Sequence, residues 1–284
     1  MCWSTTPMPE SQYSLNLDSS STFLTSPSDP GMLIPTHRSF HYPAPHAFLP
    51  SNCPTHHISC AFQALMKNIK KPFWEAPASI WDDINNVGLR GHYLCSVYGA
   101  RLMVPAGRGL IVVISSLGGL QYLFNVPYGV GKAACDRLAT DCARELRRHG
   151  VSYVSLWPGL VQTELVKEAV MKNNDTDDPL LKELRSNFSS AETTEMSGKC
   201  VVALATAVSV LTDPNILSLS GKVLPSCDLA QRYSLQDVDG RPVQDYLSLR
   251  SVLSHGSSLG WLASYLPGFL RMPKWIMTLY ASKF

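Results

Sequence analysis

The chain has 284 residues, of which 45% are hydrophobic and 16% charged, and its formal net charge is +2. This length and apolar content suit one α/β domain of ordinary size with tails. The small net charge gives no reason to expect nucleic acid as a partner, and no apolar run is long enough to span a bilayer. The start MCWSTTPMPE lacks the basic and apolar regions of a signal peptide, so we expect a reducing compartment.

Residues 1–60 differ in composition from the rest of the chain. They are rich in serine, proline and histidine, include one arginine and no lysine, and show no helical or alternating periodicity. We predict a disordered, non-homologous segment of the kind that alternative splicing produces. Its histidines and cysteines fit no standard zinc module, so we predict no metal site. These residues are His37, His41, His46, Cys53, His56, His57 and Cys60.

The remaining chain is expected to alternate helices and strands. The expected order is a helix over 77–103, a strand over 109–115, a helix over 128–149, a strand over 151–157, a polar lid over 164–200, a helix over 193–206 and a strand near 222–224. The first two strands are short, β-branched apolar runs, which is typical of strands buried on both faces of a parallel sheet. We therefore predict an N-terminally truncated, Rossmann-like, doubly wound α/β sheet.

The predicted helix over 128–149 begins with a tyrosine and a lysine four residues apart. Residues at this spacing share a helix face, so the Lys132 ammonium can lie beside the Tyr128 phenol and favour its ionised form. That pair would supply a proton donor usable near neutral pH. An isolated Tyr-x-x-x-Lys is more often part of a solvated face, so the neighbouring motifs decide its meaning.

These neighbouring motifs occur in a fixed order along the chain. The strand over 109–115 runs into two serines, the Tyr/Lys helix follows, and the next strand is closed by the pattern PG-x-V-x-T. From about Phe73 to the strand around Val223, this combination resembles the short-chain dehydrogenase/reductase family. The residues that carry the resemblance are Ser115, Ser116, Tyr128, Lys132, Pro158, Gly159, Val161 and Thr163.

The resemblance implies NAD(P)H-dependent reduction of a small carbonyl compound, ketosteroids and xenobiotic carbonyls among them, with Tyr128 handling the proton. Bringing a tyrosine pKa from near 10 to about 7 needs roughly 4 kcal/mol, which the Lys132 cation and a bound, positively charged nicotinamide can supply. Counting back from Tyr128 selects Ser115 as the substrate-orienting serine, whereas the end of the strand selects Ser116. Strand side chains alternate in direction, so the two serines are not equivalent, and we favour Ser116.

The same resemblance implies where a cofactor would lie. NADP or NAD would contact Tyr128 and Lys132 through its nicotinamide ribose, and the segment formed by Pro158, Gly159, Val161 and Thr163 would border the nicotinamide. NADP is favoured by the resemblance alone.

Two features depart from the family pattern. Relatives commonly carry Asn-x-x-Gly in the helix before the serines, where the asparagine helps to organise a proton relay, but this chain has Gly88 at that position. Gly31 is the single glycine before Gly88, so no Gly-x-Gly turn can place amide groups on a cofactor pyrophosphate. Losing about three charge-assisted hydrogen bonds would weaken cofactor binding by about 10³-fold or more. The alternative is therefore an inactive variant that binds a ligand or a partner.

The C-terminal part carries further expectations. We divide the chain into a segment 1–60, a reductase domain 61–250 and a tail 251–284. Aromatic residues with flanking cations in 261–284 suit a membrane interface, although they could instead cover the substrate pocket or pack on the core. The resemblance favours the cytosolic face of the endoplasmic reticulum, with the cytosol as the alternative, and it suggests a homodimer or a heteromer with a full-length relative. Residues 207–212 look inserted and are expected to affect the placement of the last strand.

Overall fold

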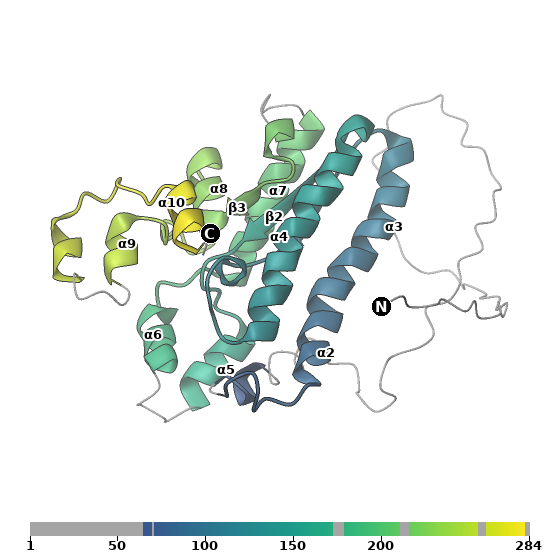
Figure 1. Ribbon diagram of the computed structural model, residues 1–284. Coiled ribbons are helices and arrows are strands. Elements are labelled where there is room, and N and C mark those ends of the chain that lie inside the picture. The colour runs from purple at the N-terminus through teal and green to yellow at the C-terminus, as the bar shows by residue number, and fades with distance from the viewer. Residues whose placement is uncertain (1–64, 70, 173–178, 211–215, 255–259, 282–284) are drawn as a thin grey trace. The chain divides into compact units, whose positions relative to one another are not determined.

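The computed structural model describes residues 65–69, 71–172, 179–210, 216–254 and 260–281. Three parallel strands form its sheet in the order β1-β2-β3 (Figure 1). They are β1 (Gly109–Ile114), β2 (Val151–Trp157) and β3 (Val223–Pro225). Gly109 pairs with Val151 in the first register, and Ser155 pairs with Val223 in the second. The predicted α/β parallel sheet is confirmed, whereas the predicted disorder of 1–60 lies outside the described residues.

The β2 strand shows why the two apolar runs form strands. All seven of its residues are buried, so the run needs no polar alternation. The described part of the sheet ends at β1, whose side chains are mostly half-buried. Among the described residues, β1 is therefore an edge strand of the sheet.

Helices cover both faces of the sheet. One face carries α3 (Gly91–Ala106) and α4 (Val126–Leu146), whose buried side chains Cys135, Ala139 and Ala143 cluster with Val113 and Tyr153. The other face carries α7 (Thr194–Val210) and α8 (Ser226–Tyr233), and its core includes Met196, Leu204, Val154, Leu156 and Leu229. Alternating side chains of the strands thus serve two separate cores, which is the doubly wound arrangement.

The other helices in the described part of the chain have between 6 and 10 residues. They are α2 (Ile80–Asn85), α5 (Glu164–Lys172), α6 (Pro179–Phe188), α9 (Leu249–Ser254) and α10 (Lys274–Ala281), with short 3-10 turns between some of them. The predicted lid thus contains α5 and α6. Each described helix is too short or too polar to cross a membrane.

The helix predicted over 77–103 is interrupted and shifted. It runs as α2, then as a π-helical turn over Asn86–Arg90, and then as α3, which ends at Ala106. Gly107 ends α3 with a φ of 65°, a left-handed conformation that glycine adopts without strain.

The helix predicted over 128–149 begins two residues earlier, at Val126. The Asn125 side chain accepts a hydrogen bond from the Tyr128 amide at 3.0 Å and caps this helix end. Pro127 suits the first turn because it has no amide proton to leave unpaired. A side-chain cap therefore decides the start of α4, just before Tyr128.

Two expectations concern the end of the chain. Of the residues 207–212 that look inserted, those at 207–210 extend α7 and the last two lie outside the described residues. The strand β3 still pairs with β2, so it is not displaced from the sheet. In the described part of the tail, four aromatic side chains are exposed rather than packed on the core. Trp261, Tyr265, Phe269 and Trp275 are between 65% and 80% exposed.

Candidate active site

The predicted catalytic residues converge at the carboxyl end of β1. Ser115 and Ser116 follow the strand directly, and Tyr128 and Lys132 lie in the first two turns of α4. A 3-10 turn, Leu117–Gly119, then connects Ser116 toward α4. Residues from two elements are thereby brought to one edge of the sheet, as the motif order predicted.

The two serines have different environments. Ser115 is only 3% exposed and donates its hydroxyl to the Lys132 carbonyl oxygen at 2.9 Å. Ser116 caps the following turn by accepting a hydrogen bond from the Gly118 amide at 3.1 Å, and its side chain is also hydrogen-bonded to Tyr128. The structure therefore places Ser116 on the phenol and Ser115 on the helix backbone.

The protonation of the Tyr/Lys pair differs from expectation. Burial raises the pKa of Tyr128, and the Ser116 hydrogen bond opposes this only in part. The Lys132 ammonium does not reach the phenol in a way that lowers its pKa, because Nζ donates to the Ile114 carbonyl at 3.0 Å and lies 5.7 Å from the Tyr128 ring centre. Burial also lowers the pKa of Lys132, although the nearby Cys135 and Asp136 act in the opposite direction and raise it. Lys132 by itself therefore does not depress the Tyr128 pKa in this arrangement.

Asp136 is a site-supporting residue that the sequence reasoning missed. Its Oδ1 accepts hydrogen bonds from the Ser155 hydroxyl at 2.6 Å and from the Trp157 indole at 2.9 Å. These donors are two residues apart on β2, so they point to the same face of the sheet. Asp136 thereby ties α4 to β2. A polar Ser155 inside an apolar strand was the available signal.

His92 was also missed, although it lies on α3 close to Lys132. Its Nε2 is 3.2 Å from the Ile114 nitrogen and 3.3 Å from the Ile114 oxygen. Burial lowers the His92 pKa, and the Lys132 charge lowers it further. The neutral ring can accept from the Ile114 amide, which leaves the Ile114 oxygen to Lys132.

The departure at Gly88 places no side chain near the site. Gly88 lies in the π-helical turn, and a side chain there would meet no atom within 4 Å. The nearby Asn85 is buried and donates Nδ2 to the Pro127 carbonyl at 3.1 Å. It contacts the start of α4 and makes no hydrogen bond to Lys132, so it does not replace an asparagine at position 88.

The segment after β2, which was predicted to border a nicotinamide, is held by hydrogen bonds to distant parts of the chain. The Gly159 amide bonds to Glu192 and Ser226, and Val161 forms a parallel bridge with Glu192. Thr163 accepts a hydrogen bond from the Val166 amide at 3.2 Å and so caps α5. In this structure the Thr163 hydroxyl therefore serves a helix cap.

The structure offers residues that could bind the nicotinamide end of a cofactor. Among the described residues, we find no glycine-rich turn that could bind the pyrophosphate end. Lys132, with a donor Nζ, and Tyr128 fit a ribose. The two consecutive glycines after β1 do not form a phosphate cradle, because a Cβ on Gly118 would lie 2.7 Å from the Tyr128 ring and one on Gly119 would lie 2.9 Å from the α4 backbone. They permit close packing on α4.

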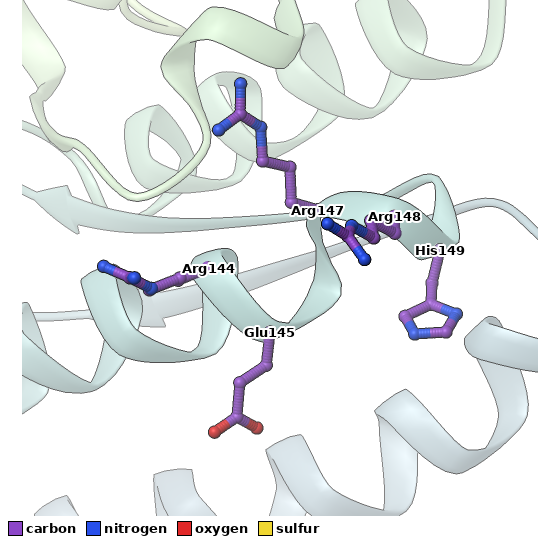
Figure 2. A pocket seen from close by; sticks show the side chains of 5 residues that line it. All are labelled: Arg144, Glu145, Arg147, Arg148 and His149. Carbon is purple, nitrogen blue, oxygen red and sulfur yellow. The ribbon is translucent and has the colours of Figure 1, made fainter.

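A hollow at the other end of α4 is separate from this site. Arg144, Glu145, Arg147, Arg148 and His149 line it (Figure 2). Figure 2 shows their side chains pointing in different directions rather than converging on one point. Cations are favoured at a helix C-terminus by the helix dipole, so a stabilised helix end explains this cluster.

Comparison with known proteins decides the family. The short chain dehydrogenase model matches residues 63–174. Over 222 residues, the chain is 77% identical to human dehydrogenase/reductase SDR family member 1, with 78% of this chain and 69% of that protein covered. The chain belongs to the short-chain dehydrogenase/reductase family. The protein of the same name from Mus musculus is 74% identical over the same shares of both chains.

The chain is thus a short-chain dehydrogenase/reductase, as its motifs predicted. Family membership implies an oxidoreductase with NAD(P) as cofactor and a small molecule as substrate. Among solved structures, ElxO with NADP bound is 25% identical with a TM-score of 0.41, covering 56% of this chain and 62% of that one.

Proposed function

We propose that this short-chain dehydrogenase/reductase reduces ketones or aldehydes to alcohols. One observation carries the proposal. The Tyr128 phenol is hydrogen-bonded to Ser116 at the carboxyl end of β1, and Lys132 lies one turn further along α4. A proton donor beside a hydroxyl that can orient a substrate is what carbonyl reduction requires of the protein.

Each residue then has one role. Ser116 donates its hydroxyl to the substrate carbonyl oxygen and holds it against Tyr128. Tyr128 transfers its phenolic proton to that oxygen, and the raised pKa keeps this proton in place at neutral pH. Lys132 turns from the Ile114 carbonyl toward the tyrosinate and the nicotinamide ribose. Bound NAD(P)H would supply the hydride.

The next part of the proposal concerns which nicotinamide cofactor and which carbonyl substrates this chain uses. Residues Pro158 to Thr163 follow β2 and would border the nicotinamide. We favour NADP over NAD and ketosteroids or small aromatic and aliphatic carbonyls as substrates, since these follow the resemblance to the reductase family.

Cofactor binding and turnover test the proposal together. NADH and NADPH are titrated into the purified chain by calorimetry, beside a chain that carries a glycine-rich cofactor-binding half. Saturable binding and carbonyl-dependent oxidation of NADPH, lost in Tyr128→Phe, are the expected results. A chain that neither binds nor turns over, beside a glycine-rich version that does both, contradicts the proposal.

The second candidate is a variant that binds a ligand or a relative without turnover. Lys132 is engaged by Ile114 rather than by the phenol, and only one glycine precedes Gly88 in the sequence. Calorimetry without cofactor binding, but with binding of a carbonyl ligand, supports this candidate. Turnover that Tyr128→Phe abolishes contradicts it.

We further propose attachment to the cytosolic face of the endoplasmic reticulum through residues 261–284. The support is the exposed aromatic set Trp261, Tyr265, Phe269 and Trp275, because such rings favour the membrane interface. Flotation with phosphatidylcholine vesicles is the test. Changing Trp261 and Phe269 to serine should abolish binding, whereas equal binding by this variant and the unchanged chain contradicts the proposal.

A partner is proposed as well. Trp81 and Tyr93, from α2 and α3, line a hollow with α4 and are 44% and 53% exposed. Exposed aromatics on a helical face suit association with a second copy or a full-length relative. Sedimentation of the purified chain, compared with Trp81→Ser, tests this face.

A further inference from the structure

Glu192, which follows the lid helix α6 in the chain, makes several of the hydrogen bonds that hold the segment after β2. Glu192 donates its amide to the Leu160 carbonyl at 2.8 Å and accepts from the Gln162 amide at 2.8 Å. Its side-chain Oε1 accepts a third hydrogen bond, from the Gly159 amide at 3.1 Å. Three bonds from Glu192 therefore set the position of residues 159–162.

The Glu192 side chain is buried and hydrogen-bonded in this position. It is only 4% exposed, and its Oε1 also accepts from the Ser226 hydroxyl at 2.5 Å. Ser226 is fully buried at the start of α8, and its own oxygen lies 3.2 Å from the Gly159 nitrogen. The Gly159 amide is thus shared between two acceptors that also bind each other.

Position 159 suits a glycine for a related reason. A Cβ there would lie 2.7 Å from Glu192 Oε1 and 3.4 Å from the Tyr246 ring. The Tyr246 hydroxyl donates to the Trp157 carbonyl at 2.8 Å, at the end of β2. The carboxyl group therefore approaches the backbone more closely than a side chain at 159 would allow.

Packing alone does not explain an ionisable group at this place. Glu192 Oε2 is buried and has no hydrogen-bond partner among the described residues. Burying a carboxyl group with one unpartnered oxygen opposes folding, whereas an apolar side chain of similar size would not. What the carboxyl group adds is an acceptor aimed at the Gly159 amide.

We propose that Glu192 is a positioning residue, which holds residues 159–162 in one register beside the reaction centre through the acceptor oxygen of its side chain. The ordering of the segment is independent of turnover, and its value for catalysis rests on the proposed reductase function. Burial raises the pKa of Glu192, and the hydrogen bonds from Ser226 and Gly159 oppose this shift. The protonated acid still has Oε1 as a hydrogen-bond acceptor. A glutamine oxygen can therefore replace it.

Hydrogen exchange of the full-length chain, followed residue by residue by NMR without cofactor, tests this role. In Glu192→Ala, the Gly159 amide should exchange on the order of tenfold faster, because its acceptor is lost. Glu192→Gln should retain the unchanged chain's rate at Gly159. Glu195→Gln, an exposed change three residues away, is the matched control and should alter neither Gly159 nor Gln162.

A second variant keeps the test decisive if Glu192→Ala fails to fold. Ser226→Ala removes one acceptor from Gly159 and leaves the Glu192 backbone bonds, so it should speed exchange at Gly159 and not at Gln162. Unchanged exchange at Gly159 in Glu192→Ala, or equal acceleration in Glu192→Gln and Glu192→Ala, overturns the proposal. A failure of the reductase function leaves these rates untouched, so the two outcomes are distinguishable.

Where the chain turns over, a kinetic result adds to the exchange rates. Glu192→Ala should raise the KM for NADPH more than it lowers kcat, and Glu192→Gln should restore that KM. A loss confined to kcat, with no rescue by glutamine, overturns the positioning role.

Discussion

At the residue scale, burial decides the protonation of the groups around α4. It is the largest cause that raises the pKa of Tyr128 and Asp136 and that lowers the pKa of Lys132. In each case, the neutral form is the one favoured by desolvation. The Lys132 side chain donates to the Ile114 carbonyl oxygen. It can lower the Tyr128 pKa only after it turns from that carbonyl toward the phenol.

The two serines give a prediction that needs no turnover. Ser116→Ala should raise the pKa of Tyr128, because it removes a hydrogen bond that lowers this pKa. Ser115→Ala should leave it unchanged, since that hydroxyl bonds to the Lys132 carbonyl. Difference absorbance titration against Tyr128→Phe measures the phenol. A larger shift in Ser115→Ala than in Ser116→Ala would assign the phenol's partner to Ser115.

Glu192 gives a pH-dependent prediction of stability. Its folded pKa is raised, so its stabilising contribution is complete below the unfolded pKa of about 4.3 and is lost as pH rises through the folded pKa. Asp237 opposes ionisation from one side, while Cys200 and Tyr246 face the carboxyl group from others.

Glu192→Gln removes this titration. Its melting temperature, relative to that of the unchanged chain, should therefore rise as pH increases from about 4 to about 7. Glu195→Gln is the control for a fully exposed acid. Calorimetric melting at several pH values gives the comparison, and a constant difference across this range speaks against a raised Glu192 pKa.

At the element scale, close approach of loops and strands holds α4 in place. Asp136 joins it to Ser155 and Trp157 of β2, and in the turn after β1 Gly118 lies against the Tyr128 ring and Gly119 against the α4 backbone. Tyr128 and Lys132 lie on this helix, so the position of α4 relative to the sheet sets their distance from Ser116.

A pair of glycine substitutions tests this packing. Gly119→Ala should destabilise the fold by about 1 to 3 kcal/mol, because its Cβ would meet the α4 backbone at 2.9 Å. Gly198→Ala on α7, where nothing lies within 4 Å, should stabilise it by about 0.5 to 1 kcal/mol through helix propensity. Urea unfolding measures both, and equal stability of the two variants would show that α4 can move away.

At the scale of the whole described domain, the C-terminal tail is fastened to the region beyond β3. The Arg271 guanidinium donates to Asp228 at 2.6 Å and to Asp245 at 3.0 Å. Backbone bonds from Leu249 to Leu270 and from Met272 to Leu247 lie on either side. The exposed aromatics are therefore presented from an anchored segment.

Removing this anchor should free the tail. In Arg271→Gln, limited trypsin digestion should cleave within 249–281 several-fold faster, because two partly buried carboxylates lose their cation. The melting temperature of the sheet should change little. Arg250→Gln, which removes a single exposed bond to the Leu266 carbonyl, is the control, and equal cleavage in both variants would argue against an Arg271 anchor.

By itself, the sequence determined the strands, the parallel α/β fold and the convergence of the two serines, Tyr128 and Lys132 at the end of the first strand. Strand runs, helix spacing and motif order depend on local geometry, so they can be read along the chain. The tertiary structure alone decided which serine meets the phenol, that Lys132 bonds to Ile114, and that Asp136 and Glu192 support the site. Those outcomes depend on burial and on contacts between residues distant in sequence, which no local pattern contains.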